Sequence, residues 1–252
     1  MEFSEKALVL KVGRFREIDA WVRLFSPKRG VYTAVAFGGC VSRRRFCGCL
    51  DVFNHVDFKV KTCRRGEFLH LLEGRLIESH PKLREKPERL GLAVNCLKFF
   101  EAACCGADGA LGAGGAYALL ADSFRALSGD APPSRFFPLF FRANVAMRQG
   151  FFPDFSRCAA CGRPVSPDDG AVFHIEEGRF FCQECPPLPG RAVSRLRPES
   201  MALLAAARIA EPAVWGLSVP SPAAGREFAS VVDRFVARHM GLSWENGMFV
   251  RT

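Results

Sequence analysis

The sequence predicts an α+β protein in which a small β-barrel precedes a helical region with a cysteine-rich insert. Three observations predict this order. Residues 1–80 contain five short runs in which apolar and polar side chains alternate, which is the period of half-buried strands. Beyond residue 81 the apolar side chains recur every three or four residues, and two Cys-x2-Cys pairs interrupt that pattern. We therefore predict a barrel at 1–80, an all-helical domain formed by 81–154 and 191–252, and an inserted module at 155–190.

The composition is that of a soluble protein with an excess of positive charge. Hydrophobic residues make up 49% of the 252 positions, and 35 Lys and Arg outnumber 26 Asp and Glu. The net charge of +9 favours an anionic partner, nucleic acid first and a membrane surface second, although solubility alone would also explain it. The first residues lack the basic and apolar regions of a signal peptide, and no apolar run approaches the ~18 residues of a membrane span. We expect a cytoplasmic chain, and 11 cysteines, an odd number, fit reduced thiols.

The five predicted strands follow one another closely and span 7–12, 20–25, 31–37, 52–61 and 67–77. In the fourth strand the apolar residues share one face and the polar residues share the other: Val52, Val56, Phe58 and Val60 against His55, Asp57, Lys59 and Lys61. Five short strands in so little chain fit a closed or nearly closed barrel, for which the five-stranded OB-fold is the common form.

Basic residues gather at the predicted turns of this barrel. Residues 1–80 contain 15 Lys and Arg against 9 Asp and Glu, a surplus of six out of the nine in the whole chain. A solvated surface normally mixes signs, so we favour a groove that follows DNA phosphates over an ordinary surface. The candidate DNA-binding residues are Lys28, Arg29, Arg43, Arg44, Arg45, Arg64 and Arg65. Four aromatic residues could stack on bases, although each is more simply explained as barrel core: Trp21, Phe25, Phe37 and Phe46.

The helical part contains several apolar stripes. One runs from Pro87 to Cys104, one covers 117–127, and a third begins with Ser134 as its cap and ends at Gly150. Two more begin at Pro198 and Pro222. The composition of the Gly- and Ala-rich stretch 106–115 predicts a flexible connection. It is not a phosphate-binding nucleotide loop, because no Gly-Lys-Ser/Thr occurs in the chain.

Two cysteine pairs form the most specific motif in the chain. Cys158 and Cys161 form the first pair, Cys182 and Cys185 form the second, and 20 residues separate the pairs. This spacing predicts one tetrahedral Zn²⁺ ion held by four thiolates, with a small hairpin at 171–181 between the pairs. Four thiolates close the coordination shell, so the metal would be structural. Two disulfides or a redox dithiol are the competing interpretations of the cysteines. His174 lies between the pairs, and we interpret it as an ordinary hairpin residue and not as a metal ligand.

The motifs of common enzymes are missing. The five histidines stand singly, and neither His-Glu-x-x-His nor Gly-x-Ser-x-Gly occurs. We therefore predict a protein without catalytic residues, and keep an enzyme as a second hypothesis. A third hypothesis is an adaptor that binds proteins only, through its zinc module and helices, without direct DNA binding.

In this order of parts, the sequence resembles the RecO family of bacterial DNA-repair proteins over nearly its whole length. The most specific match is 148–153, Arg-Gln-Gly-Phe-Phe-Pro, which leads into the first cysteine pair. Three other segments resemble the opening strands, the glycine-then-basic loop and the last helix of the family: 17–30, 34–44 and 238–242. Phe37 stands where many members carry a lysine.

The resemblance implies an N-terminal OB domain and a helical domain that carries the zinc module. It implies binding of single- and double-stranded DNA, annealing of complementary strands, and help in loading the RecA recombinase onto strands coated by single-strand-binding protein. The implied partners are DNA, RecR, single-strand-binding protein and, indirectly, RecA. No membrane is implied, and the location would be the nucleoid.

Overall fold

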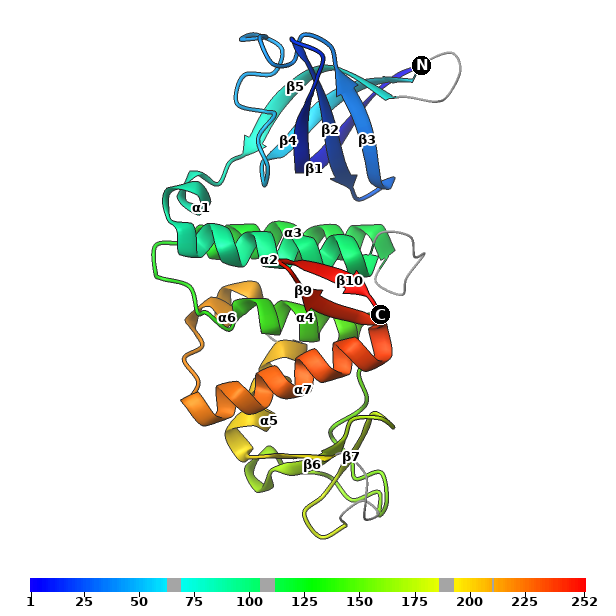
Figure 1. Cartoon of the computed structure of the whole chain (residues 1–252), viewed down its shortest axis with the longest axis vertical. Coiled ribbons are helices and arrows are strands. Elements are labelled where there is room, and N and C mark those ends of the chain that lie inside the picture. The colour runs from blue at the N-terminus through cyan, green and yellow to red at the C-terminus, as the bar shows by residue number, and fades with distance from the viewer. Residues whose placement is uncertain (63–68, 105–111, 186–192, 210) are drawn as a thin grey trace. The chain divides into compact units, whose positions relative to one another are not determined.

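The computed structural model describes residues 1–62, 69–104, 112–185, 193–209 and 211–252 (Figure 1). Contacts divide the chain into two compact units. The first unit comprises Met1–Pro87 and Gly112–Ser128, and the second comprises Glu88–Leu111 and Gly129–Thr252. Within the described ranges, the helices are too short or too polar to cross a membrane. The four segment boundaries drawn from the sequence stay a prediction.

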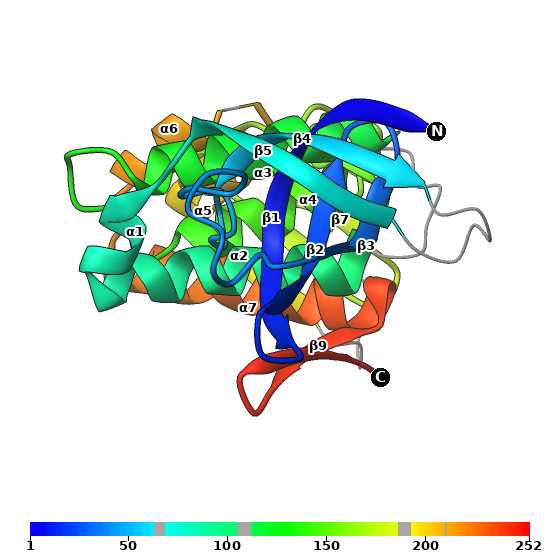
Figure 2. The same ribbon diagram turned by 90° about the horizontal axis from the view of Figure 1, so that it is seen from above.

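Five strands of the first unit close on themselves (Figure 1, Figure 2). They are β1 (Glu2–Phe15), β2 (Asp19–Ser26), β3 (Gly30–Ala36), β4 (His55–Thr62) and β5 (Leu69–Glu78), in the spatial order β1-β2-β3-β5-β4. The sheet closes because β1 pairs with β4 along its first half and with β2 along its second half. A register shift between Val9 and Lys11 bends β1 at this change of partner. The β3–β5 pair is parallel, and the other pairs are antiparallel.

The alternation of the sequence produces the interior of this barrel. Val56, Phe58 and Val60 of β4 are all fully buried in its core, as predicted. The predicted start of this strand at Val52 is wrong, because β4 begins at His55 and Val52 lies in the preceding turn. β1 is longer than the predicted 7–12, since its outer residues still find hydrogen-bond partners on β4 and β2.

Two helices belong to the first unit, α1 (Pro81–Glu85) and α3 (Gly112–Leu127). Tyr117 of α3 places its hydroxyl 2.5 Å from Nε2 of His55, and Phe124 packs edge-to-face on Phe53 at 4.9 Å. These contacts fix α3 to the barrel. α3 begins at Gly112, five residues before the predicted start and inside the stretch expected to be a connection. The sequence did not predict α1 as a separate helix.

In the described part of the second unit, five helices pack around phenylalanine side chains. They are α2 (Pro87–Cys104), α4 (Phe137–Arg148), α5 (Pro198–Ile209), α6 (Pro212–Leu217) and α7 (Pro222–Met240). The ring centre of Phe140 lies 5.0 Å from that of Phe228 in α7, and the Phe140 ring stacks on Trp215 of α6. The predicted stripes at 87–104, 198–209 and from Pro222 are therefore core faces, whereas α6 was not predicted.

Two details of the helical prediction are wrong. α4 begins at Phe137, three residues after Ser134, and its N-cap residue Phe136 makes no side-chain cap. The second unit is also not all-helical, since β9 (Leu242–Glu245) and β10 (Met248–Arg251) form a hairpin after α7. Gly241 in the left-handed region (φ 61°) ends α7 and redirects the chain into that hairpin.

A three-stranded sheet carries the cysteine pairs. Its strands are β6 (Ala171–His174), β7 (Arg179–Phe181) and β8 (Val193–Leu196), in the order β7-β6-β8, after a short 3-10 turn, η1 (Pro167–Asp169). The β6–β7 hairpin confirms the prediction, and β8 is a third strand that was not predicted. Phe173 and Phe180 stack at 4.4 Å, and Phe173 also lies 6.1 Å from Phe235 of α7. This sheet is therefore anchored on α7 through aromatic side chains.

Candidate metal centre and nucleic-acid interface

The structure brings the four predicted cysteines together. The sulfur atoms of Cys158, Cys161, Cys182 and Cys185 all lie within 4.8 Å of one another, and those of Cys161 and Cys182 are 4.0 Å apart. A tetrahedron of sulfurs around Zn²⁺, with Zn–S bonds of about 2.3 Å, has edges of roughly 3.8 Å. The observed cluster is close to that size, so four thiolates could bind one tetrahedral ion with little movement.

Local backbone geometry forms the turn of the first pair. The Gly162 N–H donates to the Cys158 carbonyl at 2.9 Å, and the Cys158 N–H donates to the Arg163 carbonyl at 2.9 Å. Gly162 has φ +69°, a left-handed conformation that costs glycine little. The turn therefore points both thiols of the pair to the same side, and the Ala159 N–H ties it to the Phe180 carbonyl at 2.8 Å.

Polar neighbours prepare these thiols to ionise. Burial raises the pKa of Cys158, but the backbone N–H groups of Cys161, Cys182 and Ala160 outweigh it and lower that pKa to about 6. The side chain of Arg163 lowers the pKa of Cys161. In contrast, the adjacent Cys182 and Cys161 sulfurs raise the pKa of Cys185 to about 12. Such crowding of negative charge is what a bound divalent cation relieves.

Arg163 connects the two cysteine pairs outside the sulfur cluster. Its Nε donates to Cys161 Sγ at 3.4 Å, and its Nη2 donates to a Glu184 carboxylate oxygen at 2.6 Å. Glu184 precedes Cys185 directly. The guanidinium thus holds the two turns together and offsets part of their negative charge.

The competing interpretations of the cysteines fit less well. Cys161 and Cys182 are free thiols, and their 4.0 Å separation is about twice a disulfide bond length. Neither pair begins a helix among the described residues, as a redox dithiol usually does. His174 lies apart from the cluster in β6, where its Nδ1 accepts the Glu177 N–H at 3.1 Å. It is a hairpin residue, as predicted.

The predicted DNA-binding residues differ in how free their charges are. Lys28, Arg43 and Arg44 are exposed and have no ion pair or hydrogen bond from their side chains to any residue that the structure describes. Arg29, in contrast, pairs with the buried Glu5 at 3.0 Å and lies 4.3 Å above the Phe3 ring. The basic turns therefore hold both free and occupied cations.

Arg45 also has a structural contact, because its Nη2 donates to the Phe37 carbonyl at 2.6 Å and so secures the loop after β3. Arg64 and Arg65 lie outside the described residues. Of the predicted set, Lys28, Arg43 and Arg44 are thus the described cations most available to a phosphate.

The four predicted aromatic residues separate into two groups. Phe25 and Phe46 are 3% exposed and belong to the interior of the first unit, so they cannot stack on bases. Phe37 is 43% exposed and meets the His70 ring edge-to-face at 4.8 Å. Trp21 is half-buried on the outside of β2, where it covers Gly13 of β1 so closely that a Cβ there would lie 2.3 Å from the indole.

Two further basic residues join Trp21 on the outer face of the barrel. In the β1–β2 register Lys11 lies opposite Arg23, two residues along each strand from Gly13 and Trp21 and therefore on the same face of the sheet. The Lys11 ammonium lies 5.6 Å from the centre of the Trp21 ring. Neither cation belongs to the predicted DNA-binding set, which contains only basic residues at the turns. The same period of two that identified the core would have placed them beside Trp21.

Comparisons with known proteins agree with the order of these parts. Residues 1–80 match the family described as Recombination protein O N terminal, and residues 112–246 match Recombination protein O C terminal. The DNA repair protein RecO of Solidesulfovibrio magneticus is 52% identical over 252 residues, which cover all of both chains. The DNA repair proteins RecO of Nitratidesulfovibrio vulgaris and Rubrobacter xylanophilus are also similar. The former is 42% identical over all of both chains, and the latter is 26% identical over 94% of this chain and 90% of its own. The chain belongs to the RecO family of DNA repair proteins.

Proposed function

We propose that this chain is a non-enzymatic mediator of recombinational DNA repair that binds single- and double-stranded DNA through its barrel. One observation carries the proposal. In a member of a DNA repair family, Arg43 and Arg44 extend from the segment between β3 and β4 without partners among the described residues. Exposed cations of this kind bind phosphates by releasing condensed counterions, and so bind all sequences alike.

The barrel itself supports this assignment. We assign it to the OB-fold, because it is a small five-stranded barrel in which β1 pairs with two neighbours. OB-folds bind nucleic acid strands on the outer face of the second and third strands. Here that face carries Trp21, with Lys11 above its ring, and an aromatic ring with an adjacent cation can stack on a base of any sequence.

Strand annealing follows from the same electrostatics. Two complementary strands repel each other through their phosphates, and a basic surface that neutralises several phosphates on each strand lowers this repulsion. The protein then needs no catalytic group, only enough cations to hold both strands. The partners implied by the family, RecR and single-strand-binding protein, would bring this activity to the strand on which RecA is loaded.

We assign the cysteine cluster to one structural Zn²⁺ ion held by Cys158, Cys161, Cys182 and Cys185. Soft thiolates in a tetrahedral arrangement favour zinc over harder cations. Four protein ligands leave no open position for a substrate or water, which argues against a zinc hydrolase. The ion would supply folding energy to a small sheet that has little core of its own.

The proposal is tested by measuring the affinity for a labelled single strand at increasing salt. If Z phosphates are neutralised, the logarithm of the binding constant should fall with the logarithm of salt with a slope of about −0.7Z. Annealing of two complementary oligonucleotides, with and without single-strand-binding protein, is measured in parallel. Binding that does not change with salt would contradict the electrostatic mechanism.

A protein-only adaptor is the second candidate, and the surface around α6 favours it. Val214 and Leu217 of α6 are 52% and 68% exposed, and Val219 beyond the helix is 93% exposed. Apolar side chains grouped in this way can bind a protein partner. The two candidates differ in one simple measurement, since an adaptor would not retard a labelled oligonucleotide at moderate salt.

A further inference from the structure

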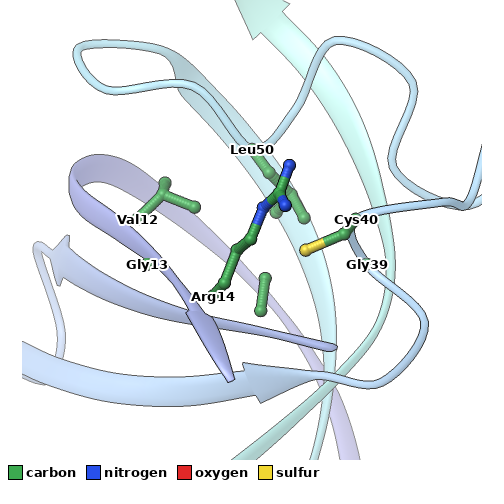
Figure 3. Close-up of a pocket in the computed structure, with 7 residues that line it drawn as sticks. Val12, Gly13, Arg14, Gly39, Cys40 and Leu50 are labelled. Carbon is green, nitrogen blue, oxygen red and sulfur yellow. The ribbon is translucent and has the colours of Figure 1, made fainter. Parts of the chain in front are cut away.

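A cavity opens on the barrel between the end of β1, the start of β2 and the segment after β3 (Figure 3). Its volume is about 300 Å³, and its walls are Val12, Gly13, Arg14, Ala20, Gly39, Cys40 and Leu50. Pockets that bind small molecules range from roughly 300 to 1,000 Å³ and are common at the mouths of barrels. A cavity at the lower end of that range has room for one small group and not for a large ligand.

The walls combine an apolar floor with one free cation. Val12 and Leu50 pack against the barrel core, and Ala20 is 1% exposed. Figure 3 shows the Arg14 side chain crossing the cavity towards Leu50, with the sulfur of Cys40 directed at it. Arg14 is exposed and makes no ion pair or hydrogen bond with any residue in the described part of the chain. A fitting ligand is therefore apolar on its faces and carries a negative charge beside it.

Hydrogen bonds hold the walls in place before any ligand binds. The Cys40 N–H donates to the Ile18 carbonyl at 2.9 Å, and its thiol donates to the Asp19 carbonyl at 3.3 Å. The Gly38 N–H donates to Asp19 Oδ1 at 2.7 Å. A Cβ at Gly39 would lie 2.9 Å from Ala36, so this close approach requires glycine. Because the cavity is already ordered, a ligand loses little binding energy in shaping it.

We infer that this cavity receives one unstacked nucleobase of a DNA single strand while Arg14 binds an adjacent phosphate. The inference rests on the proposed DNA binding and adds to it a subsite for the base. A base has apolar faces and is attached to a phosphate, which matches the floor and the cation. Arg43 and Arg44 follow Cys40 in the same loop and would attract the strand to it. A single strand yields an unstacked base at little cost, whereas a duplex must be opened. The cavity therefore favours single strands.

The test compares two labelled strands of equal length and charge, an oligothymidylate and an abasic deoxyribose-phosphate strand. Fluorescence anisotropy with the full chain measures both affinities. We expect the oligothymidylate to bind about tenfold more tightly, which is the size typical of one base contact. Tight binding of both strands without a difference would overturn the base pocket alone. Failure to bind either strand would overturn the proposed function together with it.

Variants assign this preference to the cavity. Cys40→Phe fills it and should reduce the difference between the two strands, whereas Cys47→Phe, at an exposed cysteine outside the walls, should keep it. Arg14→Gln should weaken the oligothymidylate several-fold more than Arg16→Gln does, and because Arg14 is exposed the fold should tolerate this change. An unchanged preference in the folded Cys40→Phe variant, or equal losses of affinity in Arg14→Gln and Arg16→Gln, would overturn the role of this cavity.

Discussion

The cysteine cluster and the basic surface of the barrel are assembled in opposite ways. The cluster forms from two tight turns, and each turn brings together the sulfurs of two cysteines that are three positions apart in the chain. The basic side chains of the barrel come from separate segments, and closure of the sheet fixes where each one lies: Lys11 from β1, Arg23 from β2, and Arg43 and Arg44 from the segment after β3. The geometry of a cysteine pair follows from its local sequence, whereas the positions of surface side chains depend on the core that holds their strands together. The two regions should therefore fail independently and for different reasons.

The largest effect should come from removing one sulfur ligand. Cys182→Ser leaves three of the four thiolates, so we expect it to abolish zinc binding. Bound zinc supplies about 10–16 kcal/mol of apparent folding free energy to isolated zinc-finger peptides, so its loss should destabilise the small sheet. The β6–β7 hairpin should become sensitive to proteolysis, while binding of DNA to the barrel persists. Metal analysis, limited proteolysis and anisotropy measure the three outcomes. Cys47→Ser, at an exposed cysteine outside the cluster, is the control. Loss of DNA binding together with zinc would contradict the independence of the two regions.

The matching experiment on the barrel removes a core side chain. Phe58 is fully buried, and Gly74 of β5 packs directly against its ring. Phe58→Ala should cost about 3–5 kcal/mol of folding free energy for the first unit. Hydrogen exchange of the barrel amides at increasing urea would measure it, with the exposed Phe37→Ala as control. Zinc content should stay at one ion per chain, and a loss of zinc would show that the units depend on each other.

A smaller effect is expected from reversing two surface charges. The double variant Arg43→Glu, Arg44→Glu should weaken binding to all DNA sequences alike and make the salt dependence less steep, because fewer phosphates are neutralised. The same reversal at Arg226 and Arg234, two exposed arginines of α7, is the matched control. Equal losses in both double variants would mean that net charge, and not the barrel loop, determines affinity.

The smallest effect concerns pH. Burial lowers the pKa values of His55 and His80 in the first unit. The unfolded chain binds protons near the ordinary histidine pKa of about 6.5, whereas the folded unit resists them. Stability is therefore full above about pH 6.5 and falls as the pH drops through that value towards the lowered pKa values.

Unfolding measured from about pH 7.5 to about pH 5.5 should show this loss, and His55→Gln combined with His80→Gln should reduce its slope. Because acid also protonates zinc-bound thiolates, metal content is followed in the same samples. An unchanged slope in the double variant would assign the acid sensitivity to other groups.

The sequence predicted the parts of the molecule better than their junctions. The strands, the long helices and the β6–β7 hairpin follow from local periodicity and were found, as was the grouping of the cysteines. β8 was missed because its partner is β6, an earlier strand that does not adjoin it in the chain. The β9–β10 hairpin was missed although Asn246-Gly247, a typical hairpin turn, lies between its strands. The cap predicted at Ser134 is displaced, because its hydroxyl accepts the Phe136 N–H at 3.2 Å in the turn before α4, and the helix itself begins at Phe137.

The same contrast holds for the candidate site. By itself the sequence determined the family, the grouping of the four cysteines and the sign of the charge on the barrel, because each lies in short runs of residues. Only the tertiary structure decided which cations are free. Arg29 is paired with Glu5 of β1, whereas Arg14 lies in a cavity beside Cys40 and has no ion pair with any described residue. Such differences arise from contacts between residues far apart in the chain, and these contacts exist only after the sheet has closed.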